Sequence, residues 1–327
     1  MEILLGSLSA VLVTFRRPEA LRTMIDRVAG ENAVLQRLIV VDNSPVDGAE
    51  ETLKSWRQDS VEIKYVAAPE NLGPAGAIAL GMDMILADAG DDDWILLLDD
   101  DDPPKDTGVL ESLLAFAREM RSADPATGGI GLVGARFDRR RGRGVRVLDE
   151  ELSGPVTVDY IGGNQFPLYS VRAVRHVGLF AADLFFGFDD LDYGLRMRSA
   201  GYTLHCSGPL WHAERVRRNR LSLQVRPSRR LEQLSWRRYY GLRNLVHILH
   251  QQEGPVTALR IALVHGVLHP MANIPLNPGL ALRHLGLNIR ACADGWRGRM
   301  GRTLEPDAGR LGCIRLAAAP ADGSALG

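Results

Sequence analysis

The sequence predicts an α/β fold whose sheet is mostly parallel and carries helices on both faces. Apolar runs of strand length recur between residues 8 and 133, and segments with helical periodicity separate them. The run Trp94–Leu98 is apolar on both faces, as in a strand that is covered on both sides. The chain has 327 residues and 46% hydrophobic content, enough to bury one large core or two ordinary ones. Because strands alternate with helices, right-handed crossovers within one sheet are expected.

The first half of the chain supplies most of this alternation. Ser9–Thr14 is the first expected strand, and Pro18 then begins an amphipathic helix that ends at Gly30. Leu38–Val41 is the second expected strand and runs into Asp42. The elements expected next are a helix near residues 50–58, a strand at 61–66, a helix at 77–89 after the glycine-containing loop 71–76, a helix at 109–120 and a strand at 128–133. The loop lacks the G-x-G-x-x-G pattern, which removes the main support for a nicotinamide-binding domain.

Four consecutive carboxylates, Asp99 to Asp102, follow the apolar run Trp94–Leu98. Ligands in open α/β sheets bind outside the carboxyl ends of the strands. Four carboxylates in one turn also repel one another, so we expect a hard divalent cation there, Mg²⁺ or Mn²⁺, that keeps positions open for a phosphate. A solvated acidic turn is the alternative. The acidic run Asp91–Asp93, at the entry of the strand, is expected to be ordinary surface.

Charge and composition exclude several classes of protein. The formal net charge is −1, but acidic residues cluster before residue 125 and arginines after residue 135, which suits a substrate that carries phosphates. Aromatic residues do not interleave with the arginines of segment 136–146 in the way that a nucleic-acid platform requires, so no nucleic-acid partner is expected. Three widely spaced cysteines indicate neither a disulfide framework nor a zinc site. No apolar run approaches the roughly 18 to 20 residues of a membrane span, and we expect a cytoplasmic protein.

A second acidic pair lies further along the chain, at Asp189 and Asp190. A turn-rich stretch at 161–167 and a short helix at 171–177 precede the pair, and a helical pattern that ends at Gly201 follows it. Both aspartates are therefore expected at a helix amino terminus. One of them could serve only as the N-cap.

Taken together, these motifs resemble the inverting family 2 glycosyltransferases of the GT-A fold. The resemblance covers about residues 8–215 and rests on Thr14–Pro18, Val40–Asn43, Asn71–Gly73, Asp99–Asp101 and Phe186–Arg196, in this order. Segment 238–244 resembles the tail of bacterial rhamnosyl- and galactofuranosyltransferases. Processive members of the family carry a Gln-x-x-Arg-Trp signature, whereas segment 233–237 ends in Trp-Arg, so transfer of one or a few sugars is expected.

The resemblance implies a role for each candidate residue. It implies Asp190 as the catalytic base with Asp189 beside it, and a nucleotide-diphosphate sugar as the donor, UDP- or dTDP-linked. It implies Mn²⁺ or Mg²⁺ held by Asp99, Asp101 and His212. The donor nucleotide would contact Thr14, Phe15, Arg17, Asp42, Asn71, Gly73, Asp99 and Asp100. The glycan or lipid-linked acceptor, or the diphosphate, would lie near Gly163, Asn164, Trp211 and Arg243.

The domain prediction follows from the extent of these motifs. A catalytic domain is expected over 1–230, with a nucleotide-binding half over about 1–105 and an acceptor half over about 106–230. A helical extension is expected over 231–303 and a flexible tail over 304–327. The extension either packs against the catalytic domain or lies on the inner face of the plasma membrane, where its arginines would meet anionic lipid.

Two other functions remain open from the sequence. The first is a phosphohydrolase built on an Asp-x-Asp motif, although Pro103 stands where that chemistry usually has Thr or Val. The second is a non-catalytic module that binds nucleotide sugars, although retention of both acidic motifs speaks against it.

Overall fold

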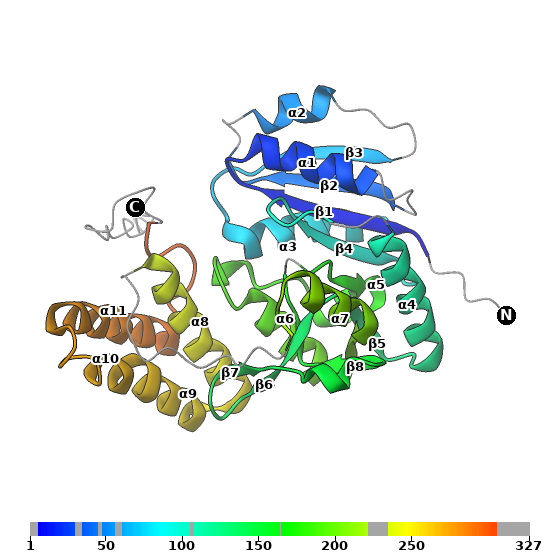
Figure 1. The fold of residues 1–327 in the computed structure, drawn as a ribbon. Coiled ribbons are helices and arrows are strands. Elements are labelled where there is room, and N and C mark those ends of the chain that lie inside the picture. The colour runs from blue at the N-terminus through cyan, green and yellow to red at the C-terminus, as the bar shows by residue number, and fades with distance from the viewer. Residues whose placement is uncertain are drawn as a thin grey trace, which may run out of the picture. The chain divides into compact units, whose positions relative to one another are not determined.

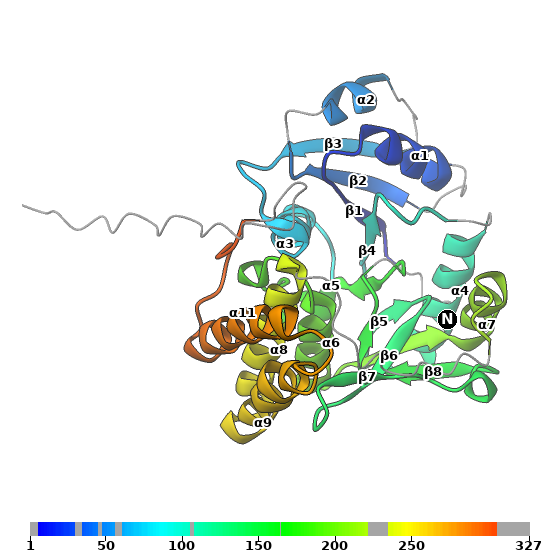
Figure 2. The same cartoon turned by 60° about the vertical axis from the view of Figure 1, so that its left-hand side comes forward.

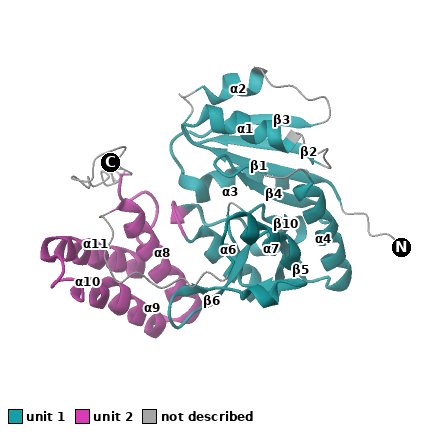
Figure 3. Ribbon diagram, viewed as in Figure 1, with its two compact units in different colours: residues 1–182, 188–226 teal, residues 183–187, 227–327 magenta. Residues whose placement is uncertain are grey.

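The computed structural model describes residues 6–29, 35–44, 48–55, 61–104, 108–163, 165–221 and 235–305. The chain divides into two compact units, shown in Figure 3. Unit 1 comprises residues 1–182 and 188–226, and unit 2 comprises residues 183–187 and 227–327. Most of the predicted tail, from residue 306 on, lies outside the described residues.

Unit 1 is built on a mixed sheet that has eight strands within the described residues, in the order β3-β2-β1-β4-β10-β5-β11-β8 (Figure 1). The strands β3, β2, β1 and β4 run parallel to one another, whereas β10 and β8 are antiparallel to their neighbours. These strands are β1 (Leu8–Thr14), β2 (Leu35–Asp42), β3 (Glu62–Ala67), β4 (Trp94–Asp99), β5 (Thr127–Gly131), β8 (Pro155–Val158), β10 (Leu168–Ser170) and β11 (Thr203–Ser207). A smaller sheet contains β6 (Gly134–Asp138), β7 (Arg143–Val145) and β9 (Tyr160–Ile161). The predicted α/β fold with a mostly parallel sheet is confirmed.

Helices cover both faces of the large sheet. Alternating side chains of β1 point to opposite faces, so that Leu12 packs in one core cluster and Val11 in the other. The first cluster contains α1 (Pro18–Ala29), α2 (Ala49–Ser55) and α4 (Val109–Ala123), and the second contains α3 (Gly73–Leu86), α5 (Val171–Val177) and α6 (Asp189–Ser199). Figure 2 shows α3 and α4 on opposite sides of the sheet. Each fully buried aliphatic side chain in these clusters stabilises the fold by about 1.5–3 kcal/mol.

The register of the parallel strands brings three polar ends to one edge of the sheet. Thr14 pairs with Asp42 across β1 and β2, and Val13 pairs with Asp99 across β1 and β4. Gly81 allows α3 to pack closely against β1, because a Cβ at this position would lie 2.4 Å from Cγ1 of Val11. The carboxyl ends predicted to form the site are therefore neighbours.

Unit 2 is helical in its described part. It contains α8 (Trp236–Glu253), α9 (Pro255–Ile261), the π-helical turn η3 (Ala262–Leu268), α10 (His269–Met271) and α11 (Pro278–Arg297). Its core joins α8 to α11, with Tyr239, Tyr240 and Leu287 buried. The Tyr240 hydroxyl donates to the Leu304 carbonyl at 2.6 Å, which ties the segment after α11 to α8. No helix in the described ranges is both long and apolar enough to cross a membrane.

Candidate functional site

The loop after β1 meets the acidic turn after β4. The hydroxyl of Thr14 donates to Asp100 at 2.7 Å, and the Arg17 guanidinium lies 3.2 Å from both Asp100 and Asp101. Phe15, which follows Thr14 in the chain, is 38% exposed. Asp100 is buried, and burial raises the pKa of its carboxyl, while the Thr14 hydroxyl and Arg17 act in the opposite direction. The predicted donor-binding residues of this loop are thus assembled around one buried carboxylate.

Asp42 lies at the end of β2 and is almost completely buried. Its carboxylate accepts hydrogen bonds from the Ser44 backbone N–H at 2.8 Å and from the Tyr65 hydroxyl at 3.0 Å. Burial, followed by the hydrogen bond to Asp42, raises the pKa of Tyr65 to about 12. Tyr65 was not among the predicted site residues, because only the pairing of β2 with β3 brings it beside Asp42.

An asparagine holds the glycine loop that begins α3. The side-chain amide of Asn43 donates to the Gly73 carbonyl at 3.0 Å, and its oxygen accepts from the Leu72 N–H at 3.2 Å. The Asn71 side chain in turn accepts from the Gly73 N–H at 2.9 Å. Gly73 has φ +70°, a conformation that favours glycine. The predicted residues Asn71 and Gly73 therefore form a rigid turn close to the end of β2, and Asn43 is a further positioning residue.

The four carboxylates after β4 differ in their surroundings. Asp100 is bound as described above, and Asp102 forms an ion pair with Arg218 at 2.6 Å. Asp99 is exposed and Asp101 is about half exposed. Partial desolvation, together with repulsion from Asp101 and Asp100, raises the pKa of Asp99 to about 6, although its side chain still reaches solvent. The two carboxylates that remain accessible are the two predicted to bind the metal.

The donor set of Asp99 and Asp101 fits a hard divalent cation. Both supply oxygen ligands, and a cation would relieve the repulsion that raises the pKa of Asp99. His212 lies exposed on α7 (Gly208–Arg217). Among the described residues, no group of three or more His, Cys, Asp or Glu side chains has the arrangement of a metal site. Two carboxylates suffice where substrate phosphates complete the coordination, as Mg²⁺ commonly requires.

Asp189 and Asp190 begin α6, as predicted, but neither is its N-cap. The N-cap is Phe188, at φ +61°, so the interpretation of one aspartate as a cap is wrong. Oδ1 of Asp190 accepts from the Leu191 N–H at 2.7 Å. Burial, followed by repulsion from Asp189, raises the pKa of Asp190 to about 7, and burial also raises the pKa of Asp189. A carboxyl that titrates near neutral pH is well suited to exchange a proton.

The neighbours of Asp190 distinguish it from the third acid of the helix. Asp192 forms an ion pair with Arg196 at 2.8 Å. Asp190, by contrast, lies near Tyr160. Burial and then the charge of Asp190 raise the pKa of the Tyr160 hydroxyl to about 12. Gly194 allows α6 to approach Tyr160, because a Cβ there would lie 2.4 Å from the Asp159 carbonyl oxygen. The close packing of α6 on β9 therefore sets the depth at which Asp190 lies.

The segment 162–167 connects the two acidic motifs. The Pro167 carbonyl accepts from the Leu97 N–H at 2.9 Å, two residues before Asp99. At the other end of the segment, the Gly163 backbone hydrogen-bonds to the Asp190 carboxylate and lowers its pKa. Asn164, also predicted near the acceptor, lies outside the described residues. One short segment thus contacts both the metal-side strand and the candidate base.

The remaining predicted residues, Trp211 and Arg243, are both buried. The Arg215 guanidinium lies over the Trp211 ring, with its Cζ atom 5.0 Å from the ring centroid. Arg243 belongs to unit 2 and is fully buried, so it is not exposed for a contact with a ligand. Its guanidinium donates to the carbonyls of Leu184 at 2.8 Å and Gly301 at 2.6 Å.

Asn244, next to Arg243, binds the chain segment that leads into α6. Its side-chain amide donates to the carbonyls of Leu184, Phe186 and Gly187 at 2.8–3.0 Å. Gly187 has φ +81°, and Phe188 follows it directly. Asn244 ends segment 238–244, which resembles the tail of related transferases, but this contact could not be predicted because its partners lie 57 to 60 positions away in the chain.

Comparisons with known proteins identify the family that part of the chain resembles. Residues 9–167 match the sequence profile of Glycosyl transferase family 2. Galactofuranosyltransferase GlfT1 of Mycolicibacterium smegmatis is 39% identical over 108 residues, which are 33% of this chain and 34% of that protein. GlfT1 of Mycobacterium tuberculosis strain H37Rv is 36% identical over 118 residues, which are 36% of this chain and 38% of that protein. The match therefore spans little more than a third of the length of these relatives.

Solved structures share the fold at low sequence identity. The mannosyltransferase PcManGT of Pyrobaculum calidifontis, in complex with GDP-Man and Mn²⁺, has a TM-score of 0.51 at 15% identity and covers 91% of this chain and 89% of its own. GalNAc-T7 with UDP, GalNAc and Mn²⁺ has a TM-score of 0.53 at 14% identity, over 76% of this chain and 48% of its own. Residues 9–167 belong to glycosyl transferase family 2, and the chain has the GT-A fold.

Proposed function

We propose that this protein is a metal-dependent inverting glycosyltransferase. It moves a sugar, such as rhamnose or galactofuranose, from a UDP- or dTDP-linked donor to a hydroxyl group. The hydroxyl belongs to a glycan or a lipid-linked acceptor in cell-surface polysaccharide synthesis. The observation that carries the proposal is the pairing of two accessible carboxylates, Asp99 and Asp101, with Asp190, a base candidate of pKa about 7 on α6; segment 162–167 contacts both β4 and the Asp190 carboxylate.

The mechanism follows from the bond that breaks. The Asp190 carboxylate accepts the proton of the acceptor hydroxyl as its oxygen attacks the anomeric carbon. The nucleoside diphosphate leaves from the opposite face, so a single displacement inverts that carbon. Asp99 and Asp101 would hold a divalent ion, which when bound would supply positive charge that stabilises the leaving diphosphate. Thr14, by its bond to Asp100, keeps the acidic turn in place.

Donor hydrolysis tests the proposal against both alternatives. Incubated with Mn²⁺ and a panel of UDP and dTDP sugars, a glycosyltransferase slowly releases nucleoside diphosphate in the absence of acceptor. A phosphohydrolase would release inorganic phosphate instead, and a binding module would release neither. Release of phosphate alone, or of nothing across the panel, would therefore reject the proposed function.

Asn244→Ala should lower turnover while donor affinity changes little. The variant removes the amide that binds three carbonyls of segment 184–187, and that segment leads into the helix that carries Asp190. A small displacement of a catalytic group can cost about 10²-fold in rate. We expect kcat to fall by about 10- to 100-fold and the free energy of unfolding by about 1–3 kcal/mol.

Asn273→Ala is the matched control for this variant. Asn273 is also buried in unit 2, but its amide donates to the His269 carbonyl within its own helical turn. It should lose similar stability and keep its turnover per folded molecule. Equal kcat values for the two variants would show that Asn244 has no positioning role.

We further propose that unit 2 contacts a membrane surface that contains anionic lipid. Val256, Leu259 and Leu263 recur at helical spacing and are 81%, 61% and 50% exposed. Other large apolar side chains exposed on this unit are Val264, Leu268, Met271, Ile274, Leu276, Leu282, Ile289 and Trp296. Arg260 and Arg283 are exposed among them. An apolar face flanked by arginines is typical of helices that lie in the membrane interface.

Co-sedimentation with liposomes tests this contact. Binding should increase with the fraction of anionic lipid and decrease with salt. Leu259→Glu should weaken partitioning by at least about tenfold, since it removes an exposed leucine that would enter the membrane interface and adds a negative charge. Leu148→Glu is the control, because Leu148 is 52% exposed on unit 1. The proposal would be contradicted if both variants lost liposome binding equally, or if binding did not depend on the fraction of anionic lipid.

A further inference from the structure

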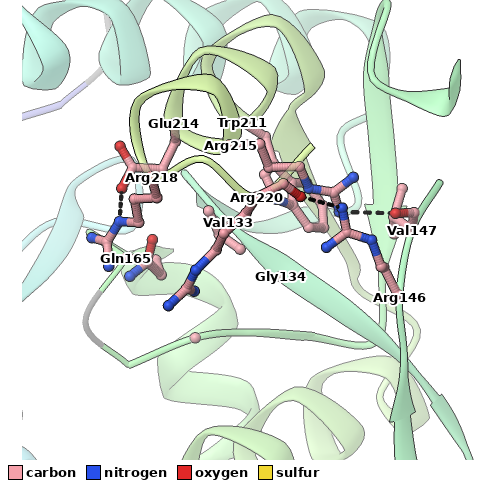
Figure 4. Close-up of a pocket in the computed structure, with 11 residues that line it drawn as sticks. Val133, Gly134, Arg146, Val147, Gln165, Trp211, Glu214, Arg215, Arg218 and Arg220 are labelled. Atoms are coloured by element: carbon pink, nitrogen blue, oxygen red, sulfur yellow. Dashed lines mark hydrogen bonds and ion pairs between the residues drawn. The ribbon is translucent and has the colours of Figure 1, made fainter. Parts of the chain in front are cut away.

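A pocket of about 350 Å³ in unit 1 is lined by four arginines (Figure 4). They are Arg146, which follows β7, and Arg215, Arg218 and Arg220 on or just after α7. Glu214 is the one acidic side chain in the lining. The volume lies at the small end of ligand pockets and suits a single substituent or a small sugar rather than a whole nucleotide sugar.

Three of the four arginines already have acidic partners. Arg146 and Arg215 both form ion pairs with Asp149. Arg218 forms ion pairs with Asp102 and Glu214. These contacts neutralise most of the positive charge and hold the guanidinium groups in fixed orientations.

Arg220 is different from the other three. Within the described part of the chain, its guanidinium has no acidic side chain at ion-pair distance. Its backbone, by contrast, is fixed on both sides, because its N–H donates to the Arg215 carbonyl and its carbonyl accepts from Arg146, both at 2.8 Å. In Figure 4 the side chain extends across the pocket toward Gln165. The Arg220 side chain is exposed, and a guanidinium without a counter-charge is suited to bind an oxyanion.

The position of the pocket indicates which substrate carries that anion. All lining residues fall between 133 and 220, and none belongs to the loops around Thr14, Asp42 or Asn71. Gly162 and Gln165 line the pocket on either side of Gly163, which hydrogen-bonds to Asp190. An anion in the pocket would therefore lie beside the candidate base and apart from the nucleotide-facing loops.

We propose that this pocket binds an oxyanion of the acceptor, a phosphate or a carboxylate, with Arg220 as its main cationic contact and Gln165 as a second polar contact. The assignment of this anion to the acceptor rests on the proposed function, whereas the oxyanion site itself rests only on the pocket. The enzyme would accordingly prefer acceptors that carry a negative charge near the hydroxyl that reacts.

Calorimetry on the full chain tests the proposal with three probes: glucose 1-phosphate, glucuronate and the neutral methyl glucoside. At least one anionic probe should bind saturably and the neutral one should not, and the comparison of the two anions tells phosphate from carboxylate. Arg220→Gln should lower the affinity for the anionic probe by about tenfold or more, as expected for a lost charge-assisted hydrogen bond. Arg143→Gln, which alters an exposed arginine outside the pocket lining, should leave it within about twofold.

UDP binding in the presence of Mn²⁺ serves as the measure of a folded donor site and should be unchanged in both variants. Absence of saturable binding by either anion would overturn the proposal, as would equal losses in the two variants. Loss of UDP affinity in Arg220→Gln would assign the pocket to the donor and overturn it as well. If donor hydrolysis fails while an anion still binds, the proposed glycosyltransferase function would be rejected and the proposed oxyanion site would still be supported.

Discussion

Asp190→Asn should abolish most turnover and leave donor affinity intact. The amide is nearly isosteric with the carboxylate and can still accept the Leu191 N–H bond, but it cannot take a proton from the acceptor. Loss of a general base lowers kcat by roughly 10²- to 10⁴-fold. Donor affinity measured by calorimetry should stay within about twofold, because the expected metal ligands, Asp99 and Asp101, lie at the end of β4 and just after it, not on α6.

The stability of Asp190→Asn distinguishes a catalytic role from a structural one. Burial raises the pKa of Asp190 to about 7, so the folded state favours the protonated form. The stability that this carboxyl contributes is fully present below its unfolded pKa near 4 and is lost as the pH rises through 7. The amide cannot ionise, so the variant should be at least as stable as the parent at pH 8. A destabilised variant that keeps full turnover would move the base to Asp189.

The pH dependence of the parent enzyme follows from the same pKa. The base works only when ionised, so kcat should rise as the pH rises through about 7 and then reach a plateau. A rate that is flat between pH 5 and 9 would contradict this assignment.

Asp101→Asn should damage binding and turnover together. A neutral amide is a poor ligand for a hard cation. A bound metal supplies several kcal/mol of stabilisation to the departing diphosphate. We therefore expect kcat to fall by at least about 10³-fold and UDP affinity to collapse, as it should in EDTA with the parent protein.

Asp91→Asn is the matched control for this variant. Asp91 precedes the entry of β4 and forms an ion pair with Arg175, far along the strand from the acidic turn. Its variant should bind UDP with the same dependence on Mn²⁺ as the parent. Equal UDP affinity with and without metal in the parent would exclude the predicted role of Asp99 and Asp101.

The amino-acid sequence by itself determined the parallel half of the fold and the location of the acidic motifs. Alternation of strand and helix within residues 8–123 depends on periodicity and on local start and stop signals, both of which are short-range properties. The end of each strand is also local, and so Asp42 and Asp99 could be predicted to meet at one edge of the sheet.

Only the tertiary structure decided which acids are accessible and what lies beside them. Asp100 is bound by a hydroxyl 86 positions away in the chain, and Asp102 by an arginine 116 positions away. The three-residue strand β10 pairs antiparallel between β4 and β5, although it is too short to show a period. Arg243 is buried against backbone carbonyls about 60 positions distant. Such contacts arise from packing between elements, and local spacing in the sequence contains no record of them.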